Sequence, residues 1–494
     1  MTKKRTLLFA AAATGILVFP SAPAMANPPQ KAPGAEVYTT HIKDLGSVGN
    51  VPVKGSAYGS ALTPKPGSQD VFYGLTDRGP NVDGPDGIKI EPYPDYAPQI
   101  GEFRMVNGHA KLNRVIELKG TDGKPLNGQV SPEADTGEEI QDLSGKVLPK
   151  SDHGYDSEGL VAMPDGSFWV SDEYGPYVTH FDAQGRQLQR LSPFNGSLPG
   201  ELKMRDPNKG MEGLTITPDG KTLVGAMQSA LVTPDLKGKP KNVVPTRIVT
   251  IDLATGKSHE YLYMRHLDSA STNISEITAL SNHEFLVDER DGDLGANSYK
   301  KLHKVDISGA TDVSQNGNVQ GSTYDAGKGG LLVGGKSIEG LTGKSNEADA
   351  ASALKNAGIT PVSSAMYLDI TKLVWGIDPT GGFFAHDKIE GVAALNGGRD
   401  LWISNDSDYG LGGSTGDKAP YGLTPKNLPD GQQDDGEFLH VNMDSIPASA
   451  KGPGYQPAGG TGSHQGPGQG NGALHNSGCR CGLNPPASRS ARAM

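Results

Sequence analysis

Four glutamates stand at the start of four short apolar segments, and in three of the four copies further acids close the segment that follows. The opening acids are Glu158, Glu212, Glu276 and Glu390. The closing acids are Asp172, Glu173, Asp288, Glu289 and Asp406, and Asp77 holds the same place in an earlier, degenerate copy. In antiparallel neighbours the start of one strand lies beside the end of the next. We therefore expect these carboxylates to meet.

Converging carboxylates in this number predict a bound cation. They repel one another unless protons or cations neutralise them. Hard oxygen ligands suit Ca²⁺, which takes about six to eight oxygens in irregular geometry, and no His or Cys spacing argues for zinc. The predicted metal ligands are Asp77, Glu158, Asp172, Glu212, Glu276, Asp288, Glu390 and Asp406. A competing interpretation is that such acids cap turns and join neighbouring strands through backbone N–H groups.

Catalytic roles are predicted for two acids and two arginines at the ends of these apolar segments. Glu173 or Glu289 is the expected general base. Arg78 follows Asp77, and Arg290 follows Glu289. Because arginine presents a planar, permanently charged fork that suits phosphate, the pair predicts a phosphate clamp. The alternative is an internal salt bridge to the preceding acid.

The elements that carry these residues read as repeated antiparallel meanders. Glu158–Met163, Ser167–Glu173, Tyr177–Asp182 and Arg186–Leu191 are four strand-like segments joined by turn residues. The pattern recurs at the other opening glutamates. Such repeats predict an all-β fold, a β-propeller of four-stranded antiparallel blades. The alternative is a β-sandwich whose segments resemble one another by chance.

The best estimate of the blade number is six, within a range of five to seven. Residues Ala365–Ile370 are the expected third strand of the sixth blade, and a helical insertion is expected near residues 348–357. Val37–Leu45 is expected to complete the blade that ends with Phe438–Asn442. Residues 121–156 form an acidic insertion between blades.

The amino-acid composition excludes several classes of fold and of binding partner. With 68 Gly and 36 Pro in 494 residues, turns must be frequent, which excludes a coiled coil or a helical bundle. A chain with 56 acidic and 45 basic residues is a poor general binder of nucleic acid. We therefore expect no nucleic-acid partner.

Both chain ends differ from the middle. Residues 1–26 combine a basic start, an apolar stretch and a small-residue cleavage site, which predicts a secretory signal peptide and no membrane span. The predicted propeller domain is 27–450. Residues 451–494 are rich in Gly and Pro and lack acids, which predicts a disordered tail. Both cysteines of the chain lie there, so no disulfide is expected in the domain.

Several motifs together resemble the phytase-like domain family, which is described as having esterase-like activity within the phytase group. They are Asp156-x-Glu158-Gly-Leu, the segment 168–176 that ends Asp-Glu-Tyr-Gly-Pro, the segment 205–214, Ile274–Leu280 with Val287–Arg290, and the copy at Glu390. The resemblance covers roughly residues 50–445. It implies a β-propeller and hydrolysis of a phosphoric ester.

These observations predict a secreted, monomeric, calcium-dependent phosphoric ester hydrolase that acts on a small-molecule phosphate ester. One alternative keeps the metal but changes the substrate to a carboxylic ester or lactone. Another is a non-catalytic, calcium-stabilised propeller that binds a cell-wall or protein partner.

Overall fold

The computed structural model describes residues 30–135 and 137–457. The predicted signal peptide and most of the predicted tail lie outside these residues. The packed chain continues past 450, because Tyr455 is buried in the same apolar cluster as Leu368. No helix in the described part is both long and apolar enough to cross a bilayer.

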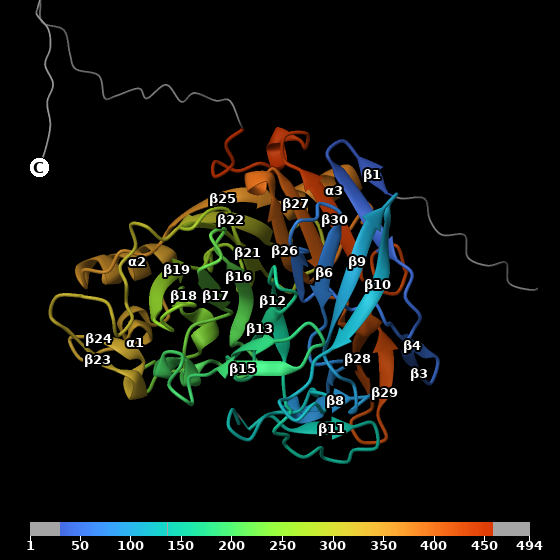
Figure 1. Ribbon diagram of the computed structural model, residues 1–494, viewed down its shortest axis with the longest axis horizontal. Coiled ribbons are helices and arrows are strands. Elements are labelled where there is room, and N and C mark those ends of the chain that lie inside the picture. Colours follow the sequence, from blue (N-terminus) through green and yellow to red (C-terminus); the bar gives the residue numbers. More distant parts are fainter. Residues whose placement is uncertain (1–29, 136, 458–494) are drawn as a thin grey trace, which may run out of the picture. The chain divides into compact units, whose positions relative to one another are not determined.

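Antiparallel arrays of four strands make up most of the fold (Figure 1). The first array contains β5 (Ala61–Pro64), β6 (Val71–Leu75), β9 (Gln99–Val106) and β10 (His109–Glu117). The second contains β12 (Ser157–Ala162), β13 (Phe168–Asp172), β14 (Val178–Phe181) and β15 (Gln187–Leu191). The third contains β16 (Met211–Ile216), β17 (Thr222–Met227), β18 (Pro245–Asp252) and β19 (Ser258–Met264).

Two more arrays complete the set in the described residues. The fourth contains β20 (Asn273–Ala279), β21 (Glu284–Arg290), β22 (Lys300–Asp306) and β25 (Ser363–Asp369). The fifth contains β26 (Ile389–Leu395), β27 (Asp400–Asn405), β30 (Glu437–Asn442) and β2 (Ala35–Thr40). We call these five arrays blades.

The first strands of the blades form a closed ring, which makes the fold a β-propeller. β5 packs beside β12, then β16, β20 and β26 follow in turn, and β26 returns to β5. Glycine permits the close approach of neighbouring strands in this ring. A Cβ at Gly159 would lie 2.4 Å from the backbone nitrogen of Leu214, and one at Gly213 would lie 2.5 Å from that of Ile277.

The expected sixth blade is not confirmed. The segment expected to be its third strand is β25, which pairs antiparallel with β22 as the outermost strand of the fourth blade. The chain between β22 and β25 forms an insertion instead of a further sheet. It contains β23 (Ser322–Asp325), β24 (Gly330–Val333), α1 (Ile338–Thr342) and α2 (Glu347–Asn356).

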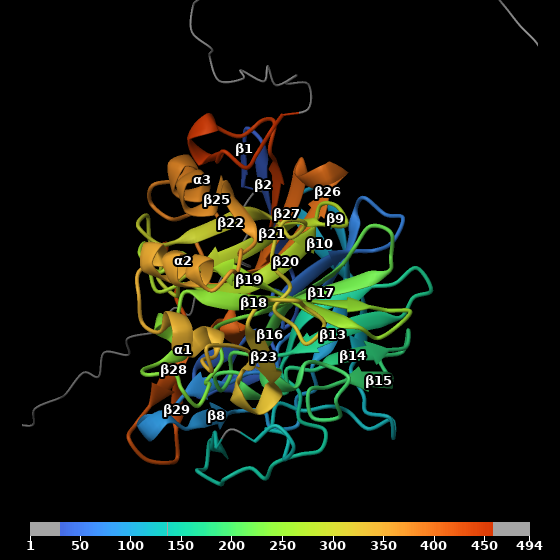
Figure 2. The ribbon, with the colours of Figure 1, turned by 90° about the vertical axis from the view of Figure 1, so that its left-hand side faces the viewer.

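This insertion covers the outer side of the third blade. Leu262 of β19 is fully buried against Leu331, Ile338 and Leu354 of the insertion, and the two helices lie beside β18 and β19 (Figure 2). The predicted helix near 348–357 is therefore confirmed as α2.

The expected closure of the last blade by an N-terminal strand is confirmed. β2 pairs antiparallel with β30, with Val37 opposite Leu439. β2 also makes a short parallel pairing with β10, which links the fifth and first blades.

The remaining elements are short. They are β1 (Lys31–Ala32), β3 (Gly46–Val48), β4 (Val51–Val53), β7 (Val82–Asp83), β8 (Lys89–Glu91), β11 (Ile140–Asp142), β28 (Leu411–Thr415), β29 (Gly422–Pro425) and α3 (Ile370–Ile377). β11 lies in the predicted acidic insertion and pairs with β8.

A buried ion-pair cluster holds the strands of the fifth blade together at one end. His386 Nδ1 lies 2.9 Å from Asp434 Oδ1, and its Nε2 lies 3.3 Å from Glu437 Oε2. Burial acts to lower the pKa of His386, but the charges and hydrogen bonds of the two carboxylates outweigh it and raise the pKa to about 10. The cluster ties the chain just before β26 to the start of β30.

Replacing Gly159 by Ala is expected to lower the free energy of unfolding by at least about 2 kcal/mol, because the new methyl group meets backbone of the next ring strand. Urea unfolding measures the change. Gly309→Ala is the matched control, since a Cβ there meets nothing within 4 Å. Equal stability of the two variants would show that the ring strands are not tightly packed.

Replacing His386 by Gln is expected to lower the free energy of unfolding by about 3–5 kcal/mol at pH 6, because it removes the buried imidazolium that pairs with Asp434 and Glu437. The folded-state pKa of His386 is above its unfolded value near 6.5. Its contribution is therefore complete below pH 6.5 and is lost as the pH rises through about 10. Unfolding curves from pH 6 to 10 should show the two proteins converging. His283→Gln, in an exposed pair with Asp306, should change stability little at any pH.

Candidate functional site

A polar cavity of about 370 Å³ opens at one mouth of the central channel. Every blade contributes to it. Its carboxylates include Asp77, Asp156, Glu158, Glu173, Glu212, Glu390, Asp406 and Asp408. Its cations are Arg78, Lys89, Lys209, Arg290 and Lys388.

The strands place these side chains through a recurring irregularity. The register of the ring strand shifts between Ser157 and Leu160 in β12, and again between Ile389 and Val392 in β26. Such a bulge re-aims a side chain at the end of a strand. Glu158 and Glu390 lie within these shifts, so both carboxylates reach the channel mouth.

Three carboxylates form the tightest acidic group in the cavity. Asp156, Glu158 and Glu173 each offer an oxygen within 4.8 Å of the other two, and all three are buried. No hydrogen bond or ion pair from the described residues reaches the carboxylate of Glu158 or Glu173. We call these three residues the acidic triad.

Burial and the repulsion between neighbouring carboxylates raise the pKa values of Glu158 and Glu173. Burial raises the pKa of Glu158 well above its usual value, and Glu212, Asp156 and Glu173 raise it further. Burial also raises the pKa of Glu173, and the charges of Glu212 and Asp156 raise it further. These groups are costly to ionise unless a cation lies among them.

Glu212 adds an unpaired acceptor beside the triad. It is 3% exposed, and its Oε2 has no hydrogen-bond partner in the described structure. Burial, with the charge of Glu390 next, raises its pKa to about 8. An orphaned buried oxygen facing a polar cavity fits a site built for a cation or a polar ligand.

The opposite side of the cavity is neutralised by the protein itself. Lys388 Nζ lies 3.0 Å from Asp406 Oδ2 and 2.5 Å from Asp408 Oδ1. Arg290 pairs with Glu390. The two sides therefore differ: ion pairs occupy one, and the other contains Glu158 and Glu173, which no ion pair from the described residues reaches.

Both predicted phosphate-clamp arginines line the cavity but are held by internal ion pairs. Arg78 Nη1 lies 3.1 Å from Glu138, and its Nε lies 3.8 Å from Asp156. Arg290 is paired as described above. Neither arginine pairs with the acid that precedes it, which was the alternative expected from the sequence.

Lys209 differs from the other lysines of the cavity because its side chain bonds to an uncharged group. Its Nζ donates to Gln228 Oε1 at 2.7 Å. Asn208 beside it adopts a left-handed backbone conformation, with φ of 54°, and also lines the cavity. This corner can present a positive charge and amide groups to an anionic ligand.

Sequence reasoning missed several of these residues. Asp156 and Lys388 each lie two positions before a predicted glutamate, and alternate residues of an extended chain share a face. That spacing is the signal that could have found them. Lys209 and Asn208 lie in a loop, where no periodicity marks them.

Three predicted metal ligands lie outside the cavity lining. Glu276 Oε1 accepts hydrogen bonds from the backbone nitrogens of Ile277 (2.8 Å) and Leu214 (3.1 Å), so it joins the third and fourth blades. Asp172 accepts from the backbone nitrogens of Gly175 and Asp156. Glu276 and Asp172 thus do what the competing interpretation expected. Asp288 is buried with both carboxylate oxygens unpartnered.

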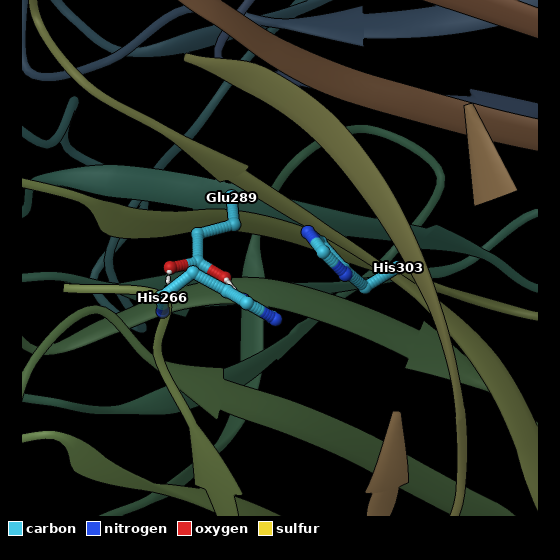
Figure 3. Close-up of side chains that lie close together, drawn as sticks. All are labelled: His266, Glu289 and His303. Carbon is cyan, nitrogen blue, oxygen red and sulfur yellow. Dashed lines mark hydrogen bonds and ion pairs between the residues drawn. The ribbon is translucent and has the colours of Figure 1, made fainter. Parts of the chain in front are cut away.

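Glu289, one of the two expected general bases, also lies away from the cavity. It is fully buried and contacts His266 and Tyr263 between the third and fourth blades. Figure 3 shows its carboxylate beside the rings of His266 and His303. It does not line the cavity that contains Glu173.

Solved structures with some likeness to this chain have low similarity. A Lactobacillus plantarum protein is 11% identical, with a TM-score of 0.30, over 83% of this chain and 99% of that one. The β-propeller domain of Myceliophteria thermophila Cps50 (Swd1) is 12% identical, with a TM-score of 0.24, over 55% of this chain and 72% of that one.

Sequence comparison is more specific. An "uncharacterized secreted protein" of Arthroderma benhamiae is 35% identical over 28% of this chain, and the match spans only 35% of that protein's own length. The phytase-like family, described as "esterase-like activity of phytase", matches residues 56–409. That span includes all five ring strands and the whole acidic triad. The chain therefore belongs to the phytase-like family.

Proposed function

We propose that this protein is an exported, calcium-dependent hydrolase of a phosphoric ester and that the cavity at the channel mouth is its active site. The observation that carries the proposal is the acidic triad: three buried carboxylates that converge, with two lacking a partner among the described residues. The family's description as an esterase-like activity agrees with a hydrolase.

The donor set of the triad fits Ca²⁺. Asp156, Glu158 and Glu173 supply only oxygens, and the unpartnered Oε2 of Glu212 lies in the same cavity. Hard oxygen donors with room for water are the usual Ca²⁺ environment. A calcium ion bound there would polarise an ester oxygen and offset the negative charge of the substrate.

The chain's own residues supply the remaining functions. Lys209 has no carboxylate partner among the described residues and is placed to bind the anionic oxygens of the ester. Glu212 faces the same space and is the candidate to take a proton from an attacking water. Arg78 and Arg290 act mainly by fixing Glu138 and Glu390, since both are already paired.

Export is part of the proposal. It rests on the secretory pattern in residues 1–26 and on the secreted relative, which matches part of this chain. The substrate is proposed to be a small molecule, because the cavity of about 370 Å³ is of the size that holds one.

Replacing Glu158 by Gln is expected to weaken Ca²⁺ binding at least about tenfold and to reduce hydrolysis of an aryl phosphate or of phytate in parallel. The physical reason is the loss of one of three converging charges. Calorimetric Ca²⁺ titration and phosphate release, each in Ca²⁺ and in EDTA, measure the two effects.

Asp219→Asn is the matched control, because Asp219 is an exposed acid that caps a turn and accepts from Lys221 N at 3.1 Å. It should leave both measurements unchanged. Unchanged Ca²⁺ affinity and turnover in the Glu158 variant would contradict the proposal. Turnover of a nitrophenyl acyl ester without phosphate release would select a carboxylic ester hydrolase. No turnover of either substrate, with Ca²⁺ still raising the melting temperature, would indicate a binding propeller.

A further inference from the structure

A second group of potential metal ligands lies between the third and fourth blades, apart from the cavity. His266 follows β19, Glu289 is on β21, and His303 is on β22 (Figure 3). One ligand atom from each lies within 4.8 Å of the other two. None of the three lines the cavity at the channel mouth.

His303 presents an unpartnered nitrogen in this group. The residue is 3% exposed. Its Nε2 lies 3.0 Å from the hydroxyl of Tyr299, and its Nδ1 is buried without a hydrogen-bond partner in the described structure. Burial, with the charge of His266 next, lowers the pKa of His303 to about 3. A neutral, buried imidazole with one free nitrogen is the form that binds a metal.

Three hydrogen-bond donors fix the position of the Glu289 carboxylate. Its carboxylate accepts hydrogen bonds from the Tyr263 hydroxyl (2.7 Å), the Thr272 hydroxyl and the backbone nitrogen of His266 (2.6 Å). Outer hydrogen bonds of this kind orient metal-binding carboxylates. The fourth contact, from His266 Nδ1 at 2.8 Å, is the one that a metal ion would replace, with release of the imidazole proton.

His266 is the member of the group that solvent reaches. Its side chain is 28% exposed, whereas that of Glu289 is fully buried. The rings of His266 and His303 stack with centroids 4.1 Å apart and planes at 18°. A metal lies in the plane of each imidazole that binds it, so the His266 ring must tilt out of this stack.

We propose that His266, Glu289 and His303 form a site for one Zn²⁺ ion or a similar transition-metal ion. Two imidazoles and one carboxylate are a donor set that zinc prefers and that calcium does not. The ion would join the third and fourth blades, because the ligands come from both. No sequence spacing marks the site, since its residues come from three separate elements.

The test uses the full chain with Cys479 and Cys481 replaced by Ser, which removes thiolates that would also bind zinc. After chelator treatment, Zn²⁺ is titrated against a chromophoric competitor, and Co²⁺ is added to follow its visible absorption. We expect His266→Gln and His303→Gln each to lose one Zn²⁺ equivalent and the matching Co²⁺ absorption. Zn²⁺ should raise the melting temperature of the parent protein but not of these variants.

Two controls separate this site from others. His259→Gln removes a histidine of β19 that pairs with Asp312 at 2.7 Å but has no third ligand, and it should keep full binding. Glu158→Gln alters the cavity and should also keep this Zn²⁺ equivalent, so the proposed function can fail without affecting the result.

A milder variant covers the case in which a buried substitution prevents folding. Tyr299→Phe keeps the ring but removes the hydroxyl beside His303, and it should weaken Zn²⁺ binding by about 10–100-fold. The proposal is overturned if the parent protein binds no Zn²⁺ or if the folded His266 and His303 variants match it in stoichiometry and affinity.

Discussion

The structure depends on the close packing of five strands around one channel. Where neighbouring ring strands approach, glycines such as Gly159 and Gly213 leave no room for a side chain. The same packing forces the ends of all five blades toward one mouth, and each blade brings charged groups with it. The fold therefore concentrates negative charge where the backbone is most constrained, and the charge must be neutralised there.

The protein neutralises that charge in two ways. On one side, Lys388 and Arg290 pair directly with acids of the fifth blade. On the other side, no ion pair from the described residues reaches Glu158 or Glu173. A molecule that needed only a stable channel would gain by pairing both sides. The asymmetry is the reason for proposing a ligand on the unpaired side.

Much of the architecture could be predicted from the sequence, but the details of the site could not. Turn residues and apolar segments predict the four-stranded units and even the strand that closes the last blade, because these signals are local. The blade number was not predictable, since β25 lies far along the chain from β22 and nothing local shows which sheet it joins. Glu173 and Glu289 occupy equivalent repeat positions, yet only Glu173 faces the cavity. The two strands pair with their ring strands in different registers, because Ser157 is opposite Asp172 whereas Glu276 is opposite Asp288.

The pairing of β2 with β30 has a consequence for how the protein matures. Thr40 bonds to Gly436, which is 396 residues away in sequence. Joining such distant segments costs loop-closure entropy that local hairpins avoid, so we expect the ring to close after the individual blades have formed. Asp77 of the first blade and Asp406 of the fifth share the cavity only once that happens. The cavity is therefore complete only after β30 has been synthesised and has paired with β2.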